Sequence, residues 1–549
     1  MLEKFLKRTD FSSPEDFKNN YELIVPENFN FAYDVVDEWA KIAPNKLAMC
    51  WTNSAGEHRN ISFGMMQAES DKMAAYLQGL GIGRGDVVML VLKRRFEFWY
   101  TLLALHKLGA IAAPATHMLT ESDLVYRNNA AQIKMIISTD DSYLVKNIND
   151  AMPESTTVKT LVCCGEAVPE GWEDMRRDYP LAHAFVRPDQ RCTNDEPLLL
   201  YFTSGTTGHP KMVVHNCVYP LGHIVTAKYW HNLSENSLHL TVADTGWAKA
   251  VWGKIYGQWI AGAAVFTFDH DVFKPKTMLN YIEQFHITSF CAPPTVYGAF
   301  MREDIAKFNL SSLKYCTAAG EPLSPALYEA FYEATGLKIH EAFGQTETTP
   351  TVVTFPWREP KPGSMGVFNP AYDMALVNDD GEPAAIGEPG EIIIRLDRFR
   401  PMGLFTGYYR DEALTAAAFE DNVYRTGDIA RMDEDGYLWF MGRNDDVIKS
   451  SGYRVGSFEV ESCILTHPYV LECAVTGVKD DIRGQVIKAT VALLPEYRDK
   501  ANNKFAKELQ QYVKEKTASY KMPRIVEFVN ELPKTTNGKI RRMKQKTNA

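Results

Sequence analysis

Apolar positions along residues 30–300 follow two alternating patterns, one typical of helices and one of buried strands. Residues 31–39 repeat apolar side chains at helical spacing, whereas residues 87–92 form a continuous apolar run of strand length. A second helical face at 96–105 and a second strand at 110–115 follow. Because strands that alternate with helices form parallel sheets covered by helices, this rhythm predicts an α/β fold.

The composition of the chain changes beyond residue 360, where glycine and proline become frequent and the predicted strands become short. This pattern predicts a small β-rich unit. The run at 442–446 is charged and carries no apolar side chain, so we place a domain boundary there and expect domains at 1–444 and 445–549. The second of these mixes helix and strand patterns. The expected fold is therefore a large N-terminal domain of helix-covered mixed sheets with a β-rich unit, followed by a small α+β domain.

Composition and charge narrow the class of protein. The chain has 549 residues, 45% hydrophobic and 23% charged, which is ordinary for a globular protein with large cores. Its net charge of −10 argues against nucleic acid as the main partner, because a phosphate backbone needs a basic face. The nine cysteines show no C-x-x-C spacing, so a reduced, intracellular setting is favoured over a metal or disulfide framework.

No targeting or membrane pattern is visible. Residues 1–16 mix basic and acidic side chains without the apolar run of a signal peptide, and the acids also argue against a transit peptide. The most apolar stretch elsewhere, at 259–268, is about half the length that a transmembrane helix needs. We therefore expect a cytoplasmic protein without a transmembrane segment.

The stretch 201–211 reads YFTSGTTGHPK and follows a predicted buried strand. Its glycines allow a tight turn with exposed backbone N–H groups, and its hydroxyls and lysine add donors, which suits a polyphosphate. It is not a Walker loop, because only two residues separate its glycines. A polar surface loop remains the alternative. The candidate ligands are Thr203, Ser204, Gly205, Thr206, Thr207, Gly208 and Lys211.

Two further polar loops follow predicted strands, TAAGEP at 317–322 and EAFGQTETT at 341–349. Three more motifs come later in the chain and read YRTGD at 424–428, GRNDDVIKSSGYRVG at 442–456 and PKTTNGK at 533–539. Read singly, each has an ordinary explanation. A glutamate in a polar loop is usually solvated, an aspartate after glycine is a common turn residue, and the last stretch lies in a basic tail.

Taken together and in this order, the six motifs resemble the adenylate-forming superfamily, which contains acyl-CoA synthetases, peptide-synthetase adenylation domains and luciferases. The resemblance runs from about residue 30 to 542. The segments ADTGWAK at 243–249 and YKMPRIVEFVNELPKTTNGKIRR at 520–542 resemble medium-chain acyl-CoA synthetases most closely. The resemblance implies that a carboxylic acid attacks the α-phosphate of ATP, releasing pyrophosphate, and that the thiol of coenzyme A then displaces AMP. ATP, Mg²⁺ and coenzyme A are therefore the expected cofactors.

The resemblance also assigns roles. The 203–208 loop and Lys211 would hold the β- and γ-phosphates, Thr346 would donate to the α-phosphate, and Glu347 would ligate Mg²⁺. Adenine would lie against Gly320, Glu321 and Pro322, and the ribose hydroxyls would meet Asp428 and Arg443. Glu341, Ala342 and Phe343 are further candidates for cofactor binding. Lys539 would reach the α-phosphate and the substrate carboxylate in the first step only.

The same resemblance implies that the predicted domain boundary is a hinge. Rotation of a mobile C-terminal domain about Asp445 would replace Lys539 by a face that carries Gly452, which leaves room for pantetheine. Arg454 and Arg483 are candidates for the nucleotide end of coenzyme A.

The acyl group is less well defined. Acetyl-CoA synthetases of this superfamily carry a tryptophan where this chain has Gly344, so a pocket for a longer or bulkier acid is expected. Trp247 and Trp252 are candidate walls, although aromatic residues at helical spacing are more often core residues. Medium-chain, branched and aromatic acids are all candidate substrates.

Three other functions compete with an acyl-CoA synthetase. The first is an aryl-CoA ligase for benzoate-like acids, and the second is an adenylation enzyme that loads a separate carrier protein. The third is a nucleotide sensor without activity, which would be expected to have lost Lys539, Glu347 or the 203–208 loop. The expected partners are a small-molecule carboxylic acid, ATP and coenzyme A, with a homodimer as a candidate assembly.

Overall fold

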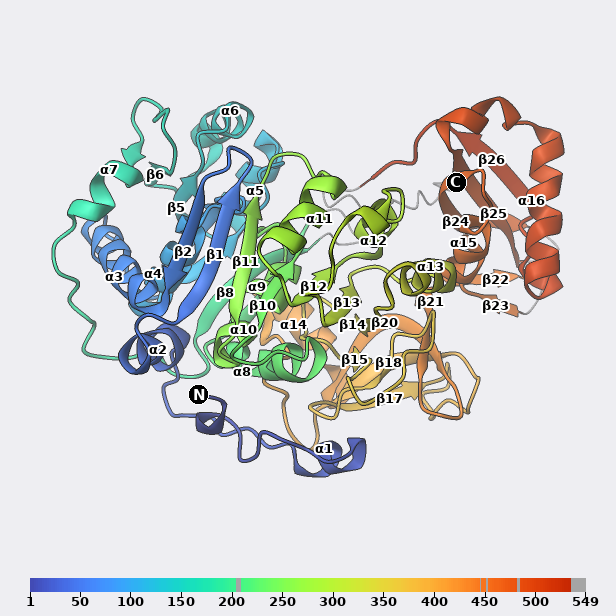
Figure 1. Ribbon diagram of the computed structural model, residues 1–549, viewed down its shortest axis with the longest axis horizontal. Helices are drawn as coiled ribbons and strands as arrows, with labels where there is room; N and C mark the ends of the chain where they lie inside the picture. Colours follow the sequence, from blue (N-terminus) through green and yellow to red (C-terminus); the bar gives the residue numbers. More distant parts are fainter. Residues whose placement is uncertain (204–208, 445, 451–452, 481–483, 535–549) are drawn as a thin grey trace.

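The computed structural model describes residues 1–203, 209–444, 446–450, 453–480 and 484–534. Its elements form two large sheets and a small sheet in the first part of the chain, and a separate lobe at the C-terminal end (Figure 1). This is the mixed α/β architecture that the sequence predicted, with a small C-terminal lobe.

The first large sheet has the order β16-β15-β14-β13-β12-β10-β11-β1-β2. Its inner strands from β1 to β14 are parallel, and the edge strands β2, β15 and β16 are antiparallel to their neighbours. The strands are β1 (Leu47–Asn53), β2 (His58–Ser62), β10 (Leu238–Thr241), β11 (Ala264–Asp269), β12 (Ser289–Ala292), β13 (Tyr315–Ala319), β14 (Ile339–Phe343), β15 (Val352–Val353) and β16 (Val367–Phe368).

The second large sheet has the order β19-β9-β8-β4-β3-β5-β6-β7 and is also mixed. Strands β3 to β8 run parallel, and β9 pairs antiparallel with both β8 and β19. The strands are β3 (Val87–Val91), β4 (Ile111–Pro114), β5 (Ile133–Ser138), β6 (Thr160–Cys163), β7 (Glu173–Asp174), β8 (Pro197–Thr203), β9 (Lys211–Asn216) and β19 (Gly407–Tyr408).

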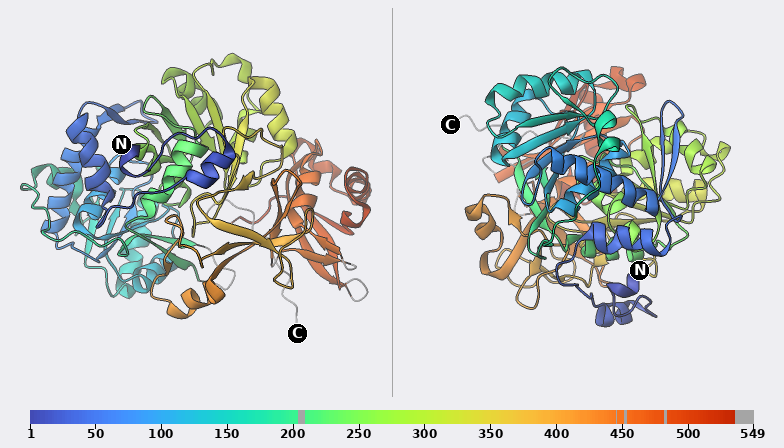
Figure 2. Two further views of the ribbon diagram at one scale, coloured as in Figure 1. Left: turned by 90° about the horizontal axis from the view of Figure 1, so that it is seen from below. Right: turned by 90° about the vertical axis from the view of Figure 1, so that its left-hand side faces the viewer.

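Helices cover these sheets and fill the space between them (Figures 1 and 2). They are α1 (Pro14–Asn20), α2 (Glu38–Ile42), α3 (Phe63–Gly79), α4 (Glu97–Leu108), α5 (Glu121–Ala130), α6 (Ser142–Ala151), α7 (Met175–Asp178), α8 (Tyr219–Ile224), α9 (Lys249–Lys254), α10 (Gly257–Ile260), α11 (Pro275–Gln284), α12 (Pro294–Phe300), α13 (Pro325–Thr335) and α14 (Glu412–Ala418). The helical repeat predicted at 31–39 begins as a π-helical turn, Ala32–Asp37, and continues as α2.

Helix α4 is buried on every side. All of its residues are buried, including His106 and Lys107. Trp99 donates from Nε1 to the Lys254 carbonyl at 2.8 Å, and the His106 ring pairs with the Tyr256 hydroxyl at 2.9 Å. A helix that is buried all round must be a central element of a large core. The surrounding apolar cluster accordingly extends from Phe5 to Phe355.

The small third sheet forms the β-rich unit expected beyond residue 360. It contains the antiparallel strands β17 (Asp373–Val377), β18 (Gly390–Arg395), β20 (Val423–Met432) and β21 (Leu438–Arg443). Gly436 has φ +81° in the turn of the last hairpin, and the Asp433 carboxylate accepts the N–H groups of Asp435 and Tyr437. These contacts form a tight turn between β20 and β21.

The C-terminal lobe has its own sheet and its own core. The strands are β22 (Ile448–Ser450), β23 (Tyr453–Val455), β24 (Val470–Asp480), β25 (Gly484–Leu493) and β26 (Ile525–Val529), and the helices are α15 (Ser457–Leu465) and α16 (Asn503–Lys516). Helix α16 is amphipathic: Phe505, Leu509 and Val513 are buried against the sheet and most of its other side chains face solvent. An independent apolar cluster is what a separate domain needs.

Buried histidines make the fold sensitive to acid. Burial lowers the pKa of each of these imidazoles below its usual value, to about 3 for His106, His215 and His239 and about 4 for His340. His223 and His231 are also buried, and their pKa values are lowered for the same reason. The unfolded chain therefore binds more protons than the folded chain as the pH falls below about 6.5.

We expect the free energy of unfolding to fall steeply between pH 6.5 and 4, by up to about 1.4 kcal/mol per pH unit for each of these histidines. Urea unfolding followed at pH 7.5, 6.5 and 5.5 measures this loss. His340→Gln should make the pH dependence shallower by about one proton, whereas His183→Gln, at an exposed position, should leave it unchanged. Equal midpoints at pH 7.5 and 5.5 would contradict the expectation.

Candidate active site

The expected metal ligand Glu347 lies in the loop that follows β14, and its backbone and side chain are both held. Phe405 N–H donates to the Glu347 carbonyl at 2.7 Å. The hydroxyl of Tyr408, on β19, donates to Glu347 Oε1 at 3.2 Å. Glu347 is thereby fixed against the edge of the second sheet, because β19 pairs with β9.

Tyr408 also contacts the expected phosphate-binding lysine. Lys211 Nζ lies 5.1 Å from the centre of the Tyr408 ring, and Lys211 opposes Thr203 across the β8–β9 hairpin. Lys211 and Thr203 therefore come to one place with Glu347, which is far from both in the sequence. Residues 204–208 of the loop between Thr203 and Lys211 lie outside the described part of the chain.

The charged groups around Glu347 and Lys211 fit a site that binds a cation and an anion together. Loss of surrounding water raises the pKa of the Glu347 carboxyl, while the Tyr408 hydroxyl, Lys211 and Arg443 act in the opposite direction. Next to it, the Thr346 carbonyl pairs with the ring of His215 on β9 at 2.9 Å. This contact connects the expected α-phosphate donor to the same hairpin as Lys211.

Gln345 connects the loop to the expected ribose pair. Its amide nitrogen donates to the Thr426 carbonyl and to the Asp428 carboxylate, and its oxygen accepts from Tyr424 at 2.7 Å. Asp428 and Arg443 oppose each other on β20 and β21, with 3.6 Å between carboxylate and guanidinium. The pair predicted for the ribose hydroxyls is thus assembled beside the loop that carries Glu347.

The expected adenine residues follow β13, and the other cofactor-binding candidates lie on β14. Gly320 follows β13 with φ +98°, a conformation that side chains disfavour, and a β-carbon built there would meet only the Lys249 side chain, at 3.8 Å. Glu341, on β14, is buried, and its Oε1 accepts from Leu323 N–H at 3.4 Å. Its Oε2 has no hydrogen-bond partner among the described residues, so a polar atom faces this region unsatisfied. Ala342 and Phe343 complete the strand, and Glu321 and Pro322 continue the loop.

Gly344 does not leave an empty space. A β-carbon at this position would lie 2.7 Å from Cη2 of Trp252, because the indole packs directly against the glycine. Trp252 is buried and meets Trp230 edge to face at 6.1 Å. Trp252 therefore occupies part of the room beside the glycine, and a pocket for a longer or bulkier acid next to Gly344 stays a prediction. Trp247 is half-buried in the segment before α9.

Several expected residues cannot be placed. Asp445, Gly452, Arg483 and Lys539 lie outside the described residues, and the side chain of Arg454 on β23 is also not described.

Comparison with known proteins gives the family of the chain. Residues 36–409 match the family of AMP-binding enzymes, and residues 459–539 match the C-terminal domain of AMP-binding enzymes. The chain belongs to the AMP-binding enzyme family.

Relatives of this AMP-binding enzyme carry acyl-CoA names. It is 39% identical over 543 residues to the human protein "Acyl-coenzyme A synthetase ACSM3, mitochondrial", covering 97% of this chain and 92% of the relative. It is 39% identical over 531 residues to human "Acyl-coenzyme A synthetase ACSM5, mitochondrial", covering 95% and 90%.

Solved structures share the fold. The anthranilate CoA ligase AuaEII in complex with anthranoyl-AMP superposes with a TM-score of 0.84 at 28% identity, covering 94% of this chain and 96% of that chain. An acyl-CoA synthetase from Brucella canis has a TM-score of 0.70 at 29% identity, covering 93% and 92%. Within the described residues of this AMP-binding enzyme, no helix combines the length and apolarity that a membrane crossing requires.

The sequence alone assigned no role to two residues of the site, Tyr408 and Gln345. Tyr408 lies in an ordinary GYY segment, and nothing in its neighbourhood of the chain indicates contact with Glu347 or Lys211. Gln345 stands inside a recognised motif, but its contacts lie about eighty positions downstream. Only the pairing of β19 with β9 and the approach of β20 bring these side chains together.

Proposed function

We propose that the protein is an ATP-dependent acyl-CoA synthetase that forms an acyl-adenylate with release of pyrophosphate and then transfers the acyl group to coenzyme A with release of AMP. The observation that carries the proposal is the joint contact of Tyr408 with Lys211 and Glu347. It brings the hairpin expected to hold phosphate to the carboxylate expected to hold Mg²⁺. The family and the acyl-CoA names of its relatives support the same reaction.

The first step needs positioned charge more than proton transfer. The pKa of a carboxylic acid substrate is about 4.3, so the acid is already ionised near neutral pH. The first step therefore requires no general base. Lys211 would neutralise the departing pyrophosphate, and Thr346 would donate to the α-phosphate. Such groups act by stabilising the charge that develops during transfer.

The residues present fit a magnesium ion that binds together with nucleotide. Mg²⁺ commonly takes one or two protein carboxylates and completes its shell with phosphate oxygens and water. In the described part of the chain, no group of three or more His, Cys, Asp or Glu side chains could hold a metal alone. Glu347, held by Tyr408, would supply one carboxylate oxygen, and the ion would offset phosphate charge there.

The domain arrangement is part of the proposal. Division into residues 1–444 and 445–549 is supported by the separate sheet and core of the C-terminal lobe. We propose that this lobe rotates about Asp445, presenting Lys539 for the first step and the face with Gly452, Arg454 and Arg483 to coenzyme A for the second.

A substrate panel tests the function. Purified protein is incubated with ATP, Mg²⁺, coenzyme A and straight-chain, branched and aromatic acids, and AMP and acyl-CoA are measured. We expect AMP and thioester with medium-chain or branched acids. Turnover of benzoates alone would favour an aryl-CoA ligase, adenylation without use of free coenzyme A would favour loading of a carrier protein, and absence of AMP with every acid would reject the proposal.

Trp252 is expected to limit the length of the acyl chain if the acid binds beside Gly344. Trp252→Leu should raise kcat/KM for octanoate relative to butyrate by about 10-fold, because each extra methylene in an apolar pocket is worth about 1–3 kcal/mol. Trp357→Leu, at a partly exposed position, is the matched control and should leave the ratio unchanged. An unaltered ratio in Trp252→Leu would place the acyl chain elsewhere.

The location and assembly of the protein also stay proposals. We keep the cytoplasmic assignment and the homodimer as predictions, although the relatives described above carry "mitochondrial" in their names. Fluorescence microscopy of a tagged full-length chain and sedimentation analysis test the two points separately.

A further inference from the structure

Helix α9 begins with a lysine that reaches the strand end beside the expected adenine residues. The Nζ atom of Lys249 donates a hydrogen bond to the Ala319 carbonyl, the last of β13, at 2.5 Å. A cation is unfavourable in the first turn of a helix, because that end of the helix dipole is already positive. The helix alone therefore gives no reason for a lysine here, and its contact with β13 does.

Lys249 also borders the open side of Gly320, the residue after this carbonyl. A β-carbon built on Gly320 would lie 3.8 Å from Nζ and from Cδ of Lys249, and within 4 Å of no other described atom outside its chain neighbours. Three residues further on, the Leu323 N–H donates to Glu341, whose second carboxyl oxygen is buried without a hydrogen-bond partner among the described residues. Room at the glycine and an unsatisfied polar atom nearby are what a bound ligand would use.

A second contact fixes α9 to the same strand. The ring of His231 pairs through Nε2 with the Trp252 carbonyl at 3.2 Å and through Nδ1 with the Thr317 hydroxyl at 2.9 Å. Because a carbonyl only accepts, Nε2 carries the proton and Nδ1 accepts from the hydroxyl. Burial lowers the pKa of this imidazole well below its usual value, so the ring is neutral near pH 7. Lys249 thus extends from a helix whose position relative to β13 is set by the fold.

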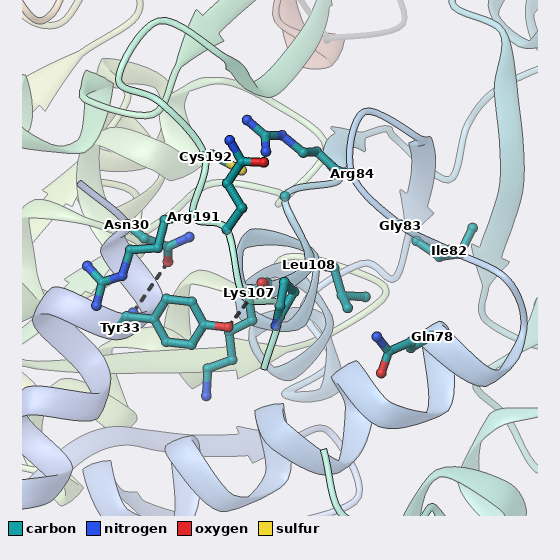
Figure 3. A pocket seen from close by; sticks show the side chains of 13 residues that line it. Asn30, Tyr33, Gln78, Ile82, Gly83, Arg84, Lys107, Leu108, Arg191 and Cys192 are labelled. Atoms are coloured by element: carbon teal, nitrogen blue, oxygen red, sulfur yellow. Dashed lines mark hydrogen bonds between the residues drawn. The ribbon is translucent and has the colours of Figure 1, made fainter. Parts of the chain in front are cut away.

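A cavity elsewhere in the chain does not offer the same kind of cation. It has a volume of about 220 Å³ and lies between α3, the end of α4 and the segment that leads into β8 (Figure 3). Two of the arginines that line it are paired with carboxylates, Arg84 with Glu196 and Arg191 with Asp34 at 2.9 Å. A nucleotide would have to compete with both carboxylates there, so this cavity is a place for control variants.

We propose that Lys249 is a positioning residue for the nucleotide: its ammonium group holds the Ala319 carbonyl and thereby keeps the backbone at Gly320 in the conformation that receives the adenine ring. The inference rests on the proposed function, which supplies the identity of the ligand. Lys249 acts through the loop and not on the reacting atoms. Its loss should therefore weaken binding of ATP and leave the rate at saturating ATP nearly unchanged.

Calorimetric titration with α,β-methylene-ATP and Mg²⁺ tests the proposal without turnover. Lys249→Met removes the charged donor but keeps a side chain of similar length. The Kd for the analogue is expected to rise about 10- to 100-fold, the usual effect of losing a hydrogen bond from a charged group. Lys249→Arg keeps a cationic donor and should restore most of the affinity, and Lys249→Gln should fall between the two. In acid-dependent exchange of pyrophosphate into ATP, Lys249→Met should raise the KM for ATP and change kcat little.

Lys254→Met is the matched control, because Lys254 ends the same helix and donates from Nζ to the Ala243 carbonyl, just after β10, at 2.9 Å. It should leave the Kd for the analogue unchanged. Arg191→Gln removes a positive charge at the cavity of Figure 3 and should also leave the Kd unchanged. Thermal unfolding of every variant shows that it is folded.

The same Kd in wild type and Lys249→Met, or equal weakening in Lys249→Met and Lys254→Met, would overturn the proposal. Absence of exchange with every acid in the wild-type protein would instead reject the proposed function, while the calorimetric comparison would still decide the role of Lys249. If the wild-type protein did not bind the analogue at all, both would be rejected.

Discussion

Replacing Glu347 by glutamine is expected to lower acid-dependent exchange of pyrophosphate into ATP by about 10²–10³-fold, the usual loss when one positioned electrostatic group is removed. The amide has the size of the carboxylate but no charge, so it should ligate Mg²⁺ poorly. The exchange assay reports the first half-reaction alone. Raising the Mg²⁺ concentration should recover part of the rate.

Tyr408→Phe gives the matched comparison. This variant keeps the carboxylate and removes only the hydroxyl that donates to Glu347 Oε1. A loss of about 5- to 10-fold is expected, which corresponds to one ordinary hydrogen bond of about 1 kcal/mol. Wild-type exchange and an unchanged Mg²⁺ requirement in Glu347→Gln would remove this residue from the proposed metal site.

Lys539→Ala is expected to separate the two half-reactions. Formation of acyl-adenylate should fall by about 10²–10³-fold, since a positive charge at the α-phosphate is lost. Thioester formation from supplied acyl-adenylate and coenzyme A should stay close to the wild-type rate, because Lys539 acts only in the first step of the proposed cycle. Single-turnover assays of each half-reaction measure the two rates.

Lys534→Ala controls for the loss of any charge from this basic segment. Lys534 pairs with Glu472 on β24 at 2.6 Å, so its removal should affect neither half-reaction by more than a small factor. If Lys539→Ala slowed both half-reactions equally, rotation of the C-terminal lobe would no longer be supported.

The alternation of apolar runs was sufficient to predict the strands and helices around the site, and the motif order was sufficient to predict which loops belong together. Glu347 and Lys211 were singled out in this way. The reason is the set of motifs and not one local pattern: each loop read alone also fits an ordinary polar surface loop, and only their common order resembles a known superfamily.

Contacts between distant segments were not predictable in the same way. Trp252 packs against Gly344 because α9 and the loop after β14 approach each other. The spacing of apolar residues along the chain does not predict this contact. Tyr408 reaches Glu347 because a two-residue strand joins the edge of the second sheet. Such pairings depend on the packing of complete layers, so they could be known only from the folded chain.

The burial of α4 has a consequence for how the large lobe can be divided. The helix touches Lys254 and Tyr256 from the middle of the chain, so a fragment that ended near residue 200 would expose it on one side. Its histidine and several aromatic rings would then face water without their partners. We therefore expect that limited proteolysis can release the last hundred residues intact, whereas expression of the first two hundred alone yields insoluble material.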